Sequence, residues 1–149
     1  MTPPQVTVLM PVFNGARYLR ASIDSILAQT FEDFELLIVD DGSTDDSRAV
    51  ARSFGDRRIR VVEHDRNRGL SASLNHGLEM AGGELIARQD QDDLSTPTRL
   101  ARQLSFLASH PDVALLGSQA RAIDADGRPL EPVERPLDEV SIRWYALVD

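Results

Sequence analysis

The stretch that decides the fold is Leu85-Ile86-Ala87-Arg88-Gln89-Asp90-Gln91-Asp92-Asp93. Its first three residues form a short apolar run, which is typical of a buried strand. The three carboxylates that follow repel one another and are costly to remove from water. A divalent cation relieves both effects, because hard cations take carboxylate oxygens and can hold a phosphate on their far side. The competing interpretation is an exposed acidic loop that binds nothing.

Outward from this stretch, short apolar runs alternate with segments of helical periodicity. The runs predict strands at residues 6–10, 36–39, 59–63, 84–87 and 113–116. Helices are predicted at about 17–29, from a cap at Ser43 or Thr44 to about Phe54 with acids in the first turn, at 70–81, and from Thr96-Pro97 to His110. The alternation predicts an α/β fold, a Rossmann-like three-layer sandwich with a mostly parallel central sheet.

After residue 118 the alternation weakens. Residues 119–124 predict another short strand, and Asp126-Gly127 predicts a turn. Residues 128–138 hold three prolines and predict a loop, and 141–148 predict the start of an element with no continuation. We therefore expect residues 1–149 to form a single domain that is truncated at its C-terminus.

The composition excludes several classes of protein. With 42% hydrophobic residues the chain can bury an aliphatic core, and its net charge of −8 argues against a nucleic-acid partner. It has no cysteine, which removes disulfides and thiolate chemistry. All 16 basic residues are arginine, and the absence of lysine excludes Walker-type phosphate loops, Schiff-base enzymes and kinases.

Polar residues gather at four places where predicted strands end. These are residues 11–15, 40–43, 64–69 and 88–93. In parallel sheets, ligands bind outside the carboxyl ends of the strands, near the point where strand order reverses. The sequence therefore predicts a ligand site built from these four segments.

Asp40-Asp41-Gly42-Ser43 ends the second predicted strand. A carboxylate here can accept the N3 hydrogen of a uracil or a ribose hydroxyl. The alternative is a polar turn in which Asp40 caps backbone amides. Paired acids after a strand also occur in phosphoryl-accepting receiver domains, but these require a lysine that this chain lacks.

Three further candidates flank the predicted site. Pro11 cannot donate to a strand ladder and ends the first strand, so the backbone of Pro11, Val12 and Asn14 can lie against a base or ribose. Arg68 precedes a helix N-terminus and can approach a phosphate, or it is simply solvated. Arg99 follows the acidic segment and either pairs with Asp93 or Asp90 or is exposed.

The combination of these motifs resembles the N-terminal half of a family 2 glycosyltransferase, over roughly residues 5–120. The motifs are residues 6–15, Val39-Asp40-Asp41-Gly42-Ser43, 67–69 with Asn75, and Asp90-Gln91-Asp92-Asp93 followed by Pro97-x-Arg99-Leu100. The resemblance implies the GT-A nucleotide-diphospho-sugar fold. It also implies an inverting, hexosyltransferase-type enzyme that transfers a sugar from a nucleotide-diphospho-sugar, most often a UDP-sugar, to an acceptor hydroxyl.

The resemblance also implies roles for individual residues. Asp41, helped by Asp40 and the backbone of residues 11–14, would bind the base and ribose, and Arg68 would lie near the phosphates. Asp92 would bind Mn²⁺ or Mg²⁺, and Asp90 would contact the metal or the ribose. The metal would bridge the diphosphate and neutralise the leaving nucleotide. Asp93 would support the acceptor side or the local structure.

Inversion needs a general base, which in this family lies well after the acidic segment. No segment of this chain matches it, and the acids in the proline-containing tail are poor candidates: Glu131, Glu134, Asp138 and Glu139. The chain therefore resembles a donor-binding half that binds nucleotide and metal with little or no transfer. The alternative is a non-catalytic nucleotide-sugar binding module completed by a partner.

Partners and location follow from composition and resemblance. The N-terminus shows no signal peptide, and no apolar stretch approaches the roughly 20 residues that span a bilayer. We expect a cytoplasmic protein with a saccharide or lipid-linked acceptor and peripheral contact with the inner face of the membrane. An incomplete fold would expose apolar surface and favour a homo-oligomer.

Overall fold

The computed structural model describes residues 3–132. The chain divides into two compact units, Met1–Ser109 and His110–Asp149. Several sequence-based predictions lie outside the described residues. These are the element at 141–148, the part of the 128–138 loop after residue 132, and the carboxylates Glu134, Asp138 and Glu139.

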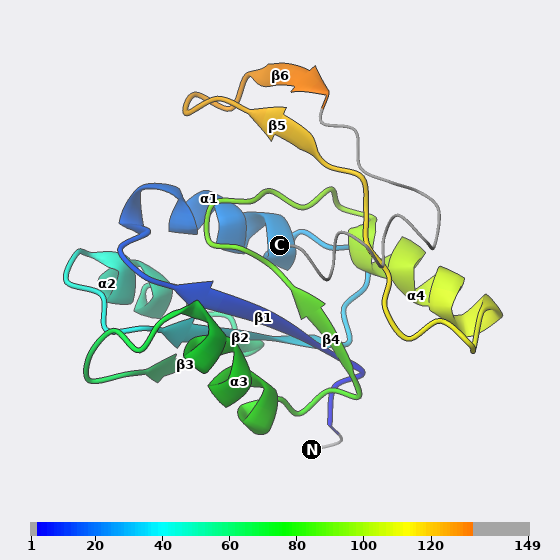
Figure 1. The fold of residues 1–149 in the computed structure, drawn as a ribbon, viewed down its shortest axis with the longest axis horizontal. Coiled ribbons are helices and arrows are strands. Elements are labelled where there is room, and N and C mark those ends of the chain that lie inside the picture. The colour runs from blue at the N-terminus through cyan, green and yellow to red at the C-terminus, as the bar shows by residue number, and fades with distance from the viewer. Residues whose placement is uncertain (1–2, 133–149) are drawn as a thin grey trace. The chain divides into compact units, whose positions relative to one another are not determined.

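The first unit contains a four-stranded parallel sheet (Figure 1). Its strands are β1 (Val6–Val12), β2 (Phe34–Asp40), β3 (Ile59–Glu63) and β4 (Leu85–Arg88), in the order β3-β2-β1-β4. The chain builds β1, β2 and β3 in one direction and then crosses to the free side of β1 for β4. This reversal lies between β1 and β4, where doubly wound sheets bind their ligands.

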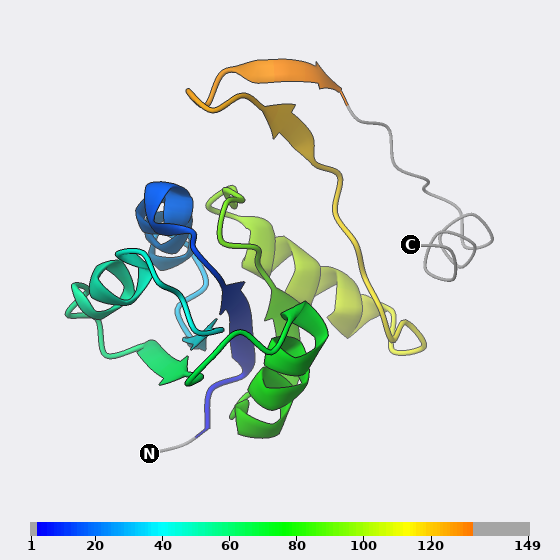
Figure 2. The same cartoon turned by 60° about the vertical axis from the view of Figure 1, so that its left-hand side comes forward.

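Helices cover both faces of the sheet (Figure 2). The helices are α1 (Ala16–Leu27), α2 (Ser47–Arg52), α3 (Leu70–Met80) and α4 (Arg99–Ser109). On one face, Val8 of β1 belongs to the same core as Ile23 of α1 and Leu100 of α4. On the other face, Leu9 packs with Leu74 of α3. Because neighbouring residues of a strand point to opposite faces, β1 reads as a continuous apolar run. The predicted three-layer α/β sandwich is confirmed.

The start of α2 differs from the prediction. The helix begins at Ser47, no side chain caps it, and its first turn carries no acid. The predicted cap fails because Ser43 and Thr44 bond to the loop after β1 instead. The amide of Asn14 donates to Ser43 Oγ (3.0 Å), and the amide of Thr44 donates to Asn14 Oδ1 (2.9 Å). These bonds join the loops that follow β1 and β2.

The start of α4 is also displaced, from Thr96-Pro97 to Arg99. The carbonyl of Thr96 accepts a hydrogen bond from Gln29 Nε2 (2.7 Å), and the carbonyl of Pro97 accepts one from the amide of Thr30 (2.8 Å). These two residues therefore bind the segment after α1 rather than open the helix.

The second unit contains an antiparallel hairpin of β5 (Arg121–Ile123) and β6 (Pro129–Pro132). The predicted strand at 119–124 and the turn at Asp126-Gly127 are confirmed. The predicted loop is wrong where β6 forms, and the predicted strand at 113–116 is wrong. Within the described residues, 113–116 pair with no other strand, and Leu115 is 78% exposed. An apolar run forms a strand only where another strand accepts its backbone hydrogen bonds.

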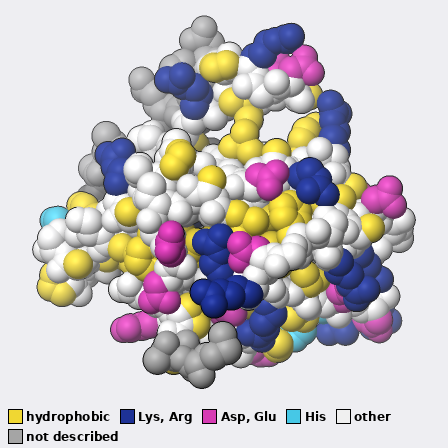
Figure 3. Space-filling model, turned by 180° about the vertical axis from the view of Figure 1, so that it is seen from behind, with side chains coloured by type: hydrophobic (Ala, Val, Ile, Leu, Met, Phe, Trp, Pro, Cys, Tyr) yellow, Lys and Arg dark blue, Asp and Glu magenta, His cyan; other side chains and the backbone are white. Residues whose placement is uncertain are grey.

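The surface carries charges of both signs. Figure 3 shows arginine side chains next to Asp and Glu side chains on one face of the molecule. In residues 3–132, no helix has the length and hydropathy needed to cross a membrane.

Candidate functional site

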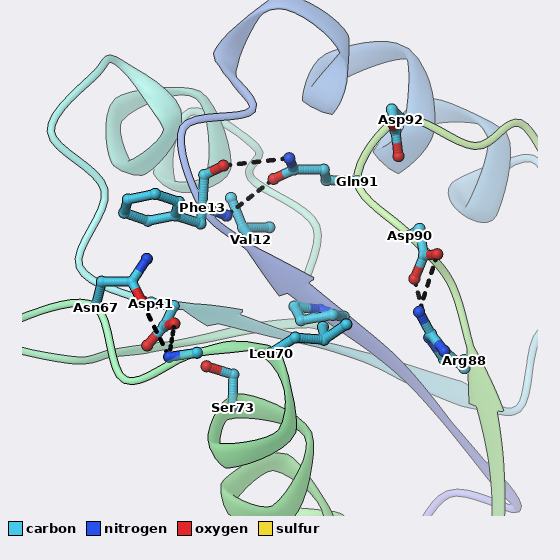
Figure 4. A pocket seen from close by; sticks show the side chains of 12 residues that line it. Val12, Phe13, Asp41, Asn67, Leu70, Ser73, Arg88, Asp90, Gln91 and Asp92 are labelled. Carbon is cyan, nitrogen blue, oxygen red and sulfur yellow. Dashed lines mark hydrogen bonds and ion pairs between the residues drawn. The ribbon is translucent and has the colours of Figure 1, made fainter. Parts of the chain in front are cut away.

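A cavity of about 290 Å³ lies at the carboxyl ends of the strands (Figure 4). Four segments far apart in the sequence line it, as the strand-end argument predicts. The predicted end of the first strand at Pro11 is wrong, because β1 continues through Pro11, opposite Val39 of β2, to Val12. The lining residues are Pro11 and Val12 at the end of β1, Phe13 after it, Asp41 after β2, Asn67, Gly69, Leu70 and Ser73 around the start of α3, and Arg88, Asp90, Gln91 and Asp92 at the end of β4.

The acidic segment contributes two carboxylates with different surroundings. Both oxygens of Asp90 accept hydrogen bonds from Arg88, from Nε at 3.0 Å and from Nη2 at 3.1 Å. The Asp92 side chain is exposed and forms no hydrogen bond or ion pair within residues 3–132. Asp92 is therefore the carboxylate that is ready to bind an added ligand.

The donor set fits a divalent cation whose coordination a bound ligand completes. Mg²⁺ is commonly held by one or two carboxylates plus substrate phosphates. Asp90 and Asp92 supply such hard oxygen donors beside one cavity. The described part of the chain contains no group of three or more His, Cys, Asp or Glu residues arranged to hold a metal alone. A cation here would therefore need further oxygens from its ligand.

Asp93 lies at the end of the acidic segment and does not line the cavity. Its amide donates to the carbonyl of Asp90 (3.2 Å), which closes a tight turn. Burial, together with the negative charges of Asp90 and Asp92, raises the pKa of the Asp93 carboxyl above its ordinary value. Its predicted role on the acceptor side stays a prediction.

Gln89 and Arg99 form the support beneath the acidic segment. Gln89 is buried, and its Nε2 donates to the carbonyl of Asp93 (2.7 Å). Arg99 donates to Gln89 Oε1, to Ser95 Oγ (2.7 Å) and to the carbonyl of Arg88 (2.7 Å). Arg99 therefore pairs with neither predicted carboxylate and is not exposed. Burial lowers the pKa of its guanidinium despite the charge of Asp93.

Gln91 joins the acidic segment to the loop after β1. Its Oε1 accepts from the amide of Phe13 (2.9 Å), and its Nε2 donates to the carbonyl of Phe13 (3.2 Å). Gly15 leaves room for this side chain, because a Cβ at that position would lie 2.3 Å from Gln91 Oε1. We call this two-bond contact the Gln91 clasp. The clasp anchors the residue between Asp90 and Asp92, so it restrains the backbone that carries both carboxylates.

Replacing Gln91 with alanine is expected to weaken Mn²⁺ binding about 10-fold, because supporting groups of this kind orient metal ligands. The free energy of unfolding should change by less than about 1 kcal/mol, since the lost bonds are exposed to water. Isothermal titration and urea denaturation measure the two quantities. Gln5→Ala, at an exposed glutamine, is the control. Unchanged Mn²⁺ affinity in Gln91→Ala would contradict the role of the clasp.

Asp41 is buried and accepts three hydrogen bonds. Its Oδ1 accepts from His64 Nδ1 (2.7 Å) and from the amide of Arg68 (2.9 Å), and its Oδ2 accepts from the amide of Gly69 (2.8 Å). Burial alone would raise the pKa of this carboxyl, but the three donors outweigh it and hold the pKa below its ordinary value. Asp41 is therefore ionised and fixes the loop before α3.

A pair of histidines, His64 and His76, is linked to Asp41, and the sequence did not predict this link. His64 Nε2 lies 2.8 Å from His76 Nδ1, and the two rings stack with centroids 5.0 Å apart. Since the ionised Asp41 can only accept, His64 donates from Nδ1. In the neutral pair His64 Nε2 then accepts from His76. His64 and the amide of Arg68 thus share the acceptor Asp41 Oδ1, while the amide of Gly69 donates to Oδ2.

Three predicted nucleotide-binding residues do not line the cavity. Asp40 is buried and its Oδ2 accepts from Arg48 Nε (2.6 Å), while its Oδ1 has no hydrogen-bond partner among the described residues. Asn14 has a positive φ of 50° and joins the loops after β1 and β2. The Arg68 side chain is exposed and donates to Asp65 (3.0 Å). Their roles in nucleotide binding stay predictions.

Gly42→Ala is expected to lower the free energy of unfolding by about 2 kcal/mol. Gly42 has a φ of +74°, and a Cβ there would lie 2.4 Å from the backbone carbon of Arg66. The left-handed backbone and the close approach both oppose a side chain at this position. A Cβ here would push apart the loops that follow β2 and β3. Urea denaturation measures the loss. Gly55→Ala, where a Cβ meets nothing within 4 Å, is the control, and equal losses in the two variants would contradict the argument.

The sequence profile described as Glycosyl transferase family 2 matches residues 7–145. EpsE of Bacillus subtilis, a protein assigned as a glycosyltransferase, is 41% identical over 127 residues, which cover 83% of this chain and 46% of EpsE. An uncharacterized glycosyltransferase of Rickettsia felis is 36% identical over 97% of this chain and 25% of its own length. The chain thus spans less than half the length of these relatives.

Solved structures show the same architecture. S. aureus TarS, crystallised with UDP, is similar with a TM-score of 0.68 and 26% identity, over 72% of this chain and 33% of that one. The mannosyltransferase PcManGT of Pyrobaculum calidifontis, in complex with GDP-Man and Mn²⁺, gives a TM-score of 0.63 and 33% identity over 71% of this chain and 33% of its own. These neighbours share the GT-A fold. The parallel sheet, the cavity at its switch point and the sequence match show that this chain belongs to glycosyl transferase family 2.

Proposed function

We propose that the chain binds a nucleotide-diphospho-sugar together with Mn²⁺ or Mg²⁺, for transfer of the sugar to an acceptor hydroxyl with inversion. The observation that carries the proposal is that Asp41, Arg88, Asp90 and Asp92 line one cavity at the β1–β4 reversal. UDP-GlcNAc in TarS and GDP-Man with Mn²⁺ in PcManGT support this class of ligand. A UDP-sugar is the donor that we favour.

Different residues of the cavity bind different parts of the donor. Asp92 holds the cation and Asp90 completes the protein's share of its ligands. When bound, the cation neutralises negative charge on the departing nucleoside diphosphate. The backbone of Pro11 and Val12 contacts the base and ribose. Asp41 fixes the conformation of the loop before α3, on the other side of the nucleotide, through the amides of Arg68 and Gly69. These roles place the reacting sugar near the end of β4.

The acceptor side extends beyond the cavity described here. An inverting transfer needs a base that removes the acceptor proton, and no residue among 3–132 is assigned that role. We propose that the acceptor is a saccharide or a lipid-linked molecule, and that residues outside 3–132 help to bind it. Contact with a membrane surface would bring a lipid-linked acceptor to the site.

Isothermal titration of the purified chain with UDP, GDP and ADP, each with and without Mn²⁺, tests the proposal. We expect saturable heat from a nucleoside diphosphate only with Mn²⁺, with UDP binding most tightly, and loss of that heat on adding EDTA. Absence of saturable heat from all three diphosphates in Mn²⁺ would reject the proposed site. Tighter binding of GDP would keep the site but change the donor.

A further inference from the structure

Arg88 lines the cavity, and neither the sequence motifs nor the comparisons assign it a role of its own. It ends β4 and its side chain is 54% exposed. Its guanidinium lies beside the cavity and donates two hydrogen bonds to Asp90, at 3.0 and 3.1 Å (Figure 4). A planar guanidinium that meets both oxygens of one carboxylate is a strong, oriented contact.

This contact occupies the oxygens that the proposed function requires. A cation bound to Asp90 would share that carboxylate with a positively charged guanidinium, and two positive charges this close repel each other. The Asp92 carboxylate has no such partner among the described residues. Arg88 therefore competes with a cation for Asp90 and leaves Asp92 available.

Among the described residues that line the cavity, Arg88 is the only arginine or lysine. Arg68 and Arg99 flank the cavity segments in the sequence, but their side chains do not line the cavity. The Arg68 side chain donates to Asp65, and Arg99 donates to Gln89, Ser95 and a backbone carbonyl. A diphosphate that binds in this cavity would therefore have Arg88 as its positively charged partner in the protein. Guanidinium binds phosphate oxygens with the same two-donor geometry that it uses for carboxylates.

We propose that Arg88 exchanges partners when the donor binds, an inference that rests on the function proposed above. Without ligand, Arg88 neutralises Asp90. When a cation takes the Asp90 oxygens, the guanidinium turns to the diphosphate of the donor. Only side chains need to move, because the Asp90 carbonyl is held by Ser22 Oγ (3.0 Å) and by the Asp93 amide (3.2 Å). Arg88 is thus a specificity residue for the diphosphate.

The exchange predicts effects of opposite sign in one variant. Arg88→Ala frees Asp90, so Mn²⁺ alone should bind about 3- to 10-fold more tightly. The same variant lacks the diphosphate contact, so UDP at saturating Mn²⁺ should bind about 10-fold more weakly. Arg88→Lys keeps one charge without the fork and should restore part of the UDP affinity. Mn²⁺ affinity is measured from the free-ion signal in electron paramagnetic resonance, and UDP affinity by isothermal titration.

Arg52→Ala is the matched control, since Arg52 is an exposed arginine paired with Glu63 (2.8 Å) outside the cavity. It should change neither affinity, and circular dichroism checks that all variants are folded. Unchanged or weaker Mn²⁺ binding in Arg88→Ala, or unchanged UDP binding, would overturn the exchange while wild-type binding still upholds the proposed function. Failure of the wild-type chain to bind any nucleoside diphosphate with Mn²⁺ would overturn both.

Discussion

Asp92→Ala is expected to weaken Mn²⁺-dependent UDP binding by at least about 100-fold. Asp92 lines the cavity, is exposed and forms no hydrogen bond or ion pair with other described residues. Its carboxylate is therefore expected to contribute to ligand binding and little to folding. The chain carries a net charge of −8. Without a cation on Asp92, Arg88 is the one positively charged side chain among the described residues of the cavity that could attract a diphosphate.

Isothermal titration with UDP and Mn²⁺ measures the loss, and the free energy of unfolding should stay within about 0.5 kcal/mol of the wild-type value. Asp92→Asn keeps the shape and removes the charge, and it should lose nearly as much affinity. Asp24→Ala removes an exposed carboxylate of α1 and controls for net charge. Unchanged heat in Asp92→Ala would reject Asp92 as a metal ligand.

Asp41→Ala is expected to lower the free energy of unfolding by about 3 to 4 kcal/mol at pH 7. The substitution leaves His64 Nδ1 and the amide of Arg68 without their acceptor, in a place where Asp41 is only 3% exposed, and it leaves the amide of Gly69 with Asn67 Oδ1 alone (3.0 Å). Each buried donor without a partner carries a penalty of about 1 to 3 kcal/mol. The loop before α3 should therefore loosen, and UDP binding should fall with it.

The pH dependence of this loss follows from the lowered pKa of Asp41. Its ordinary value is 3.8, and the folded chain holds it below that. A depressed carboxyl contributes its full stabilisation above the ordinary pKa and loses it as the pH falls through the folded value. The difference between wild type and Asp41→Ala should therefore be constant from pH 7 to about 5 and shrink below about 4.

Urea denaturation at pH 7, 5, 4 and 3 checks this prediction. The matched control is Asp65→Ala, which removes an exposed carboxylate that pairs only with Arg68 across 3.0 Å. Exposed pairs of this kind contribute about 0.5 kcal/mol. A similar loss in both variants would show that the donors around Asp41 find other partners and that its carboxylate is not a structural centre.

Much of the fold could be predicted from the sequence because each of the first four strands is an apolar run between helical patterns. β1 and β2 are buried on both faces, and that is the arrangement that continuous apolar runs favour. The run at 113–116 looks similar in composition and is not a strand. Strand pairing depends on a neighbour that supplies backbone partners, and local composition does not report one.

The helix ends were less predictable for a related reason. Ser43 and Thr44 have the side chains of helix caps, but they bond to Asn14, about 30 residues earlier in the chain. A local motif gives no sign of such a distant competitor. The structure shows the same limit at α4, where Thr96 binds Gln29.

The candidate site likewise contains residues that could be predicted from the sequence and residues that could not. Asp41, Asp90 and Asp92 were predictable because they follow strands directly, and the cavity brings them together. The Gln91 clasp and the His64–His76 pair were not, because their partners lie 78 and 12 residues away in the chain. Glutamine and histidine at those positions had no local pattern to distinguish them from surface residues.

The Gln91 clasp has a consequence for the order in which ligands arrive. It ties the segment with the proposed metal ligands to the backbone of Phe13, beside the proposed base and ribose contacts. A cation that steadies one loop also steadies the other. Thermodynamic linkage then requires a nucleotide to raise the affinity for the cation by the same factor by which the cation raises the affinity for the nucleotide. Cutting the clasp should reduce this reciprocal factor toward one.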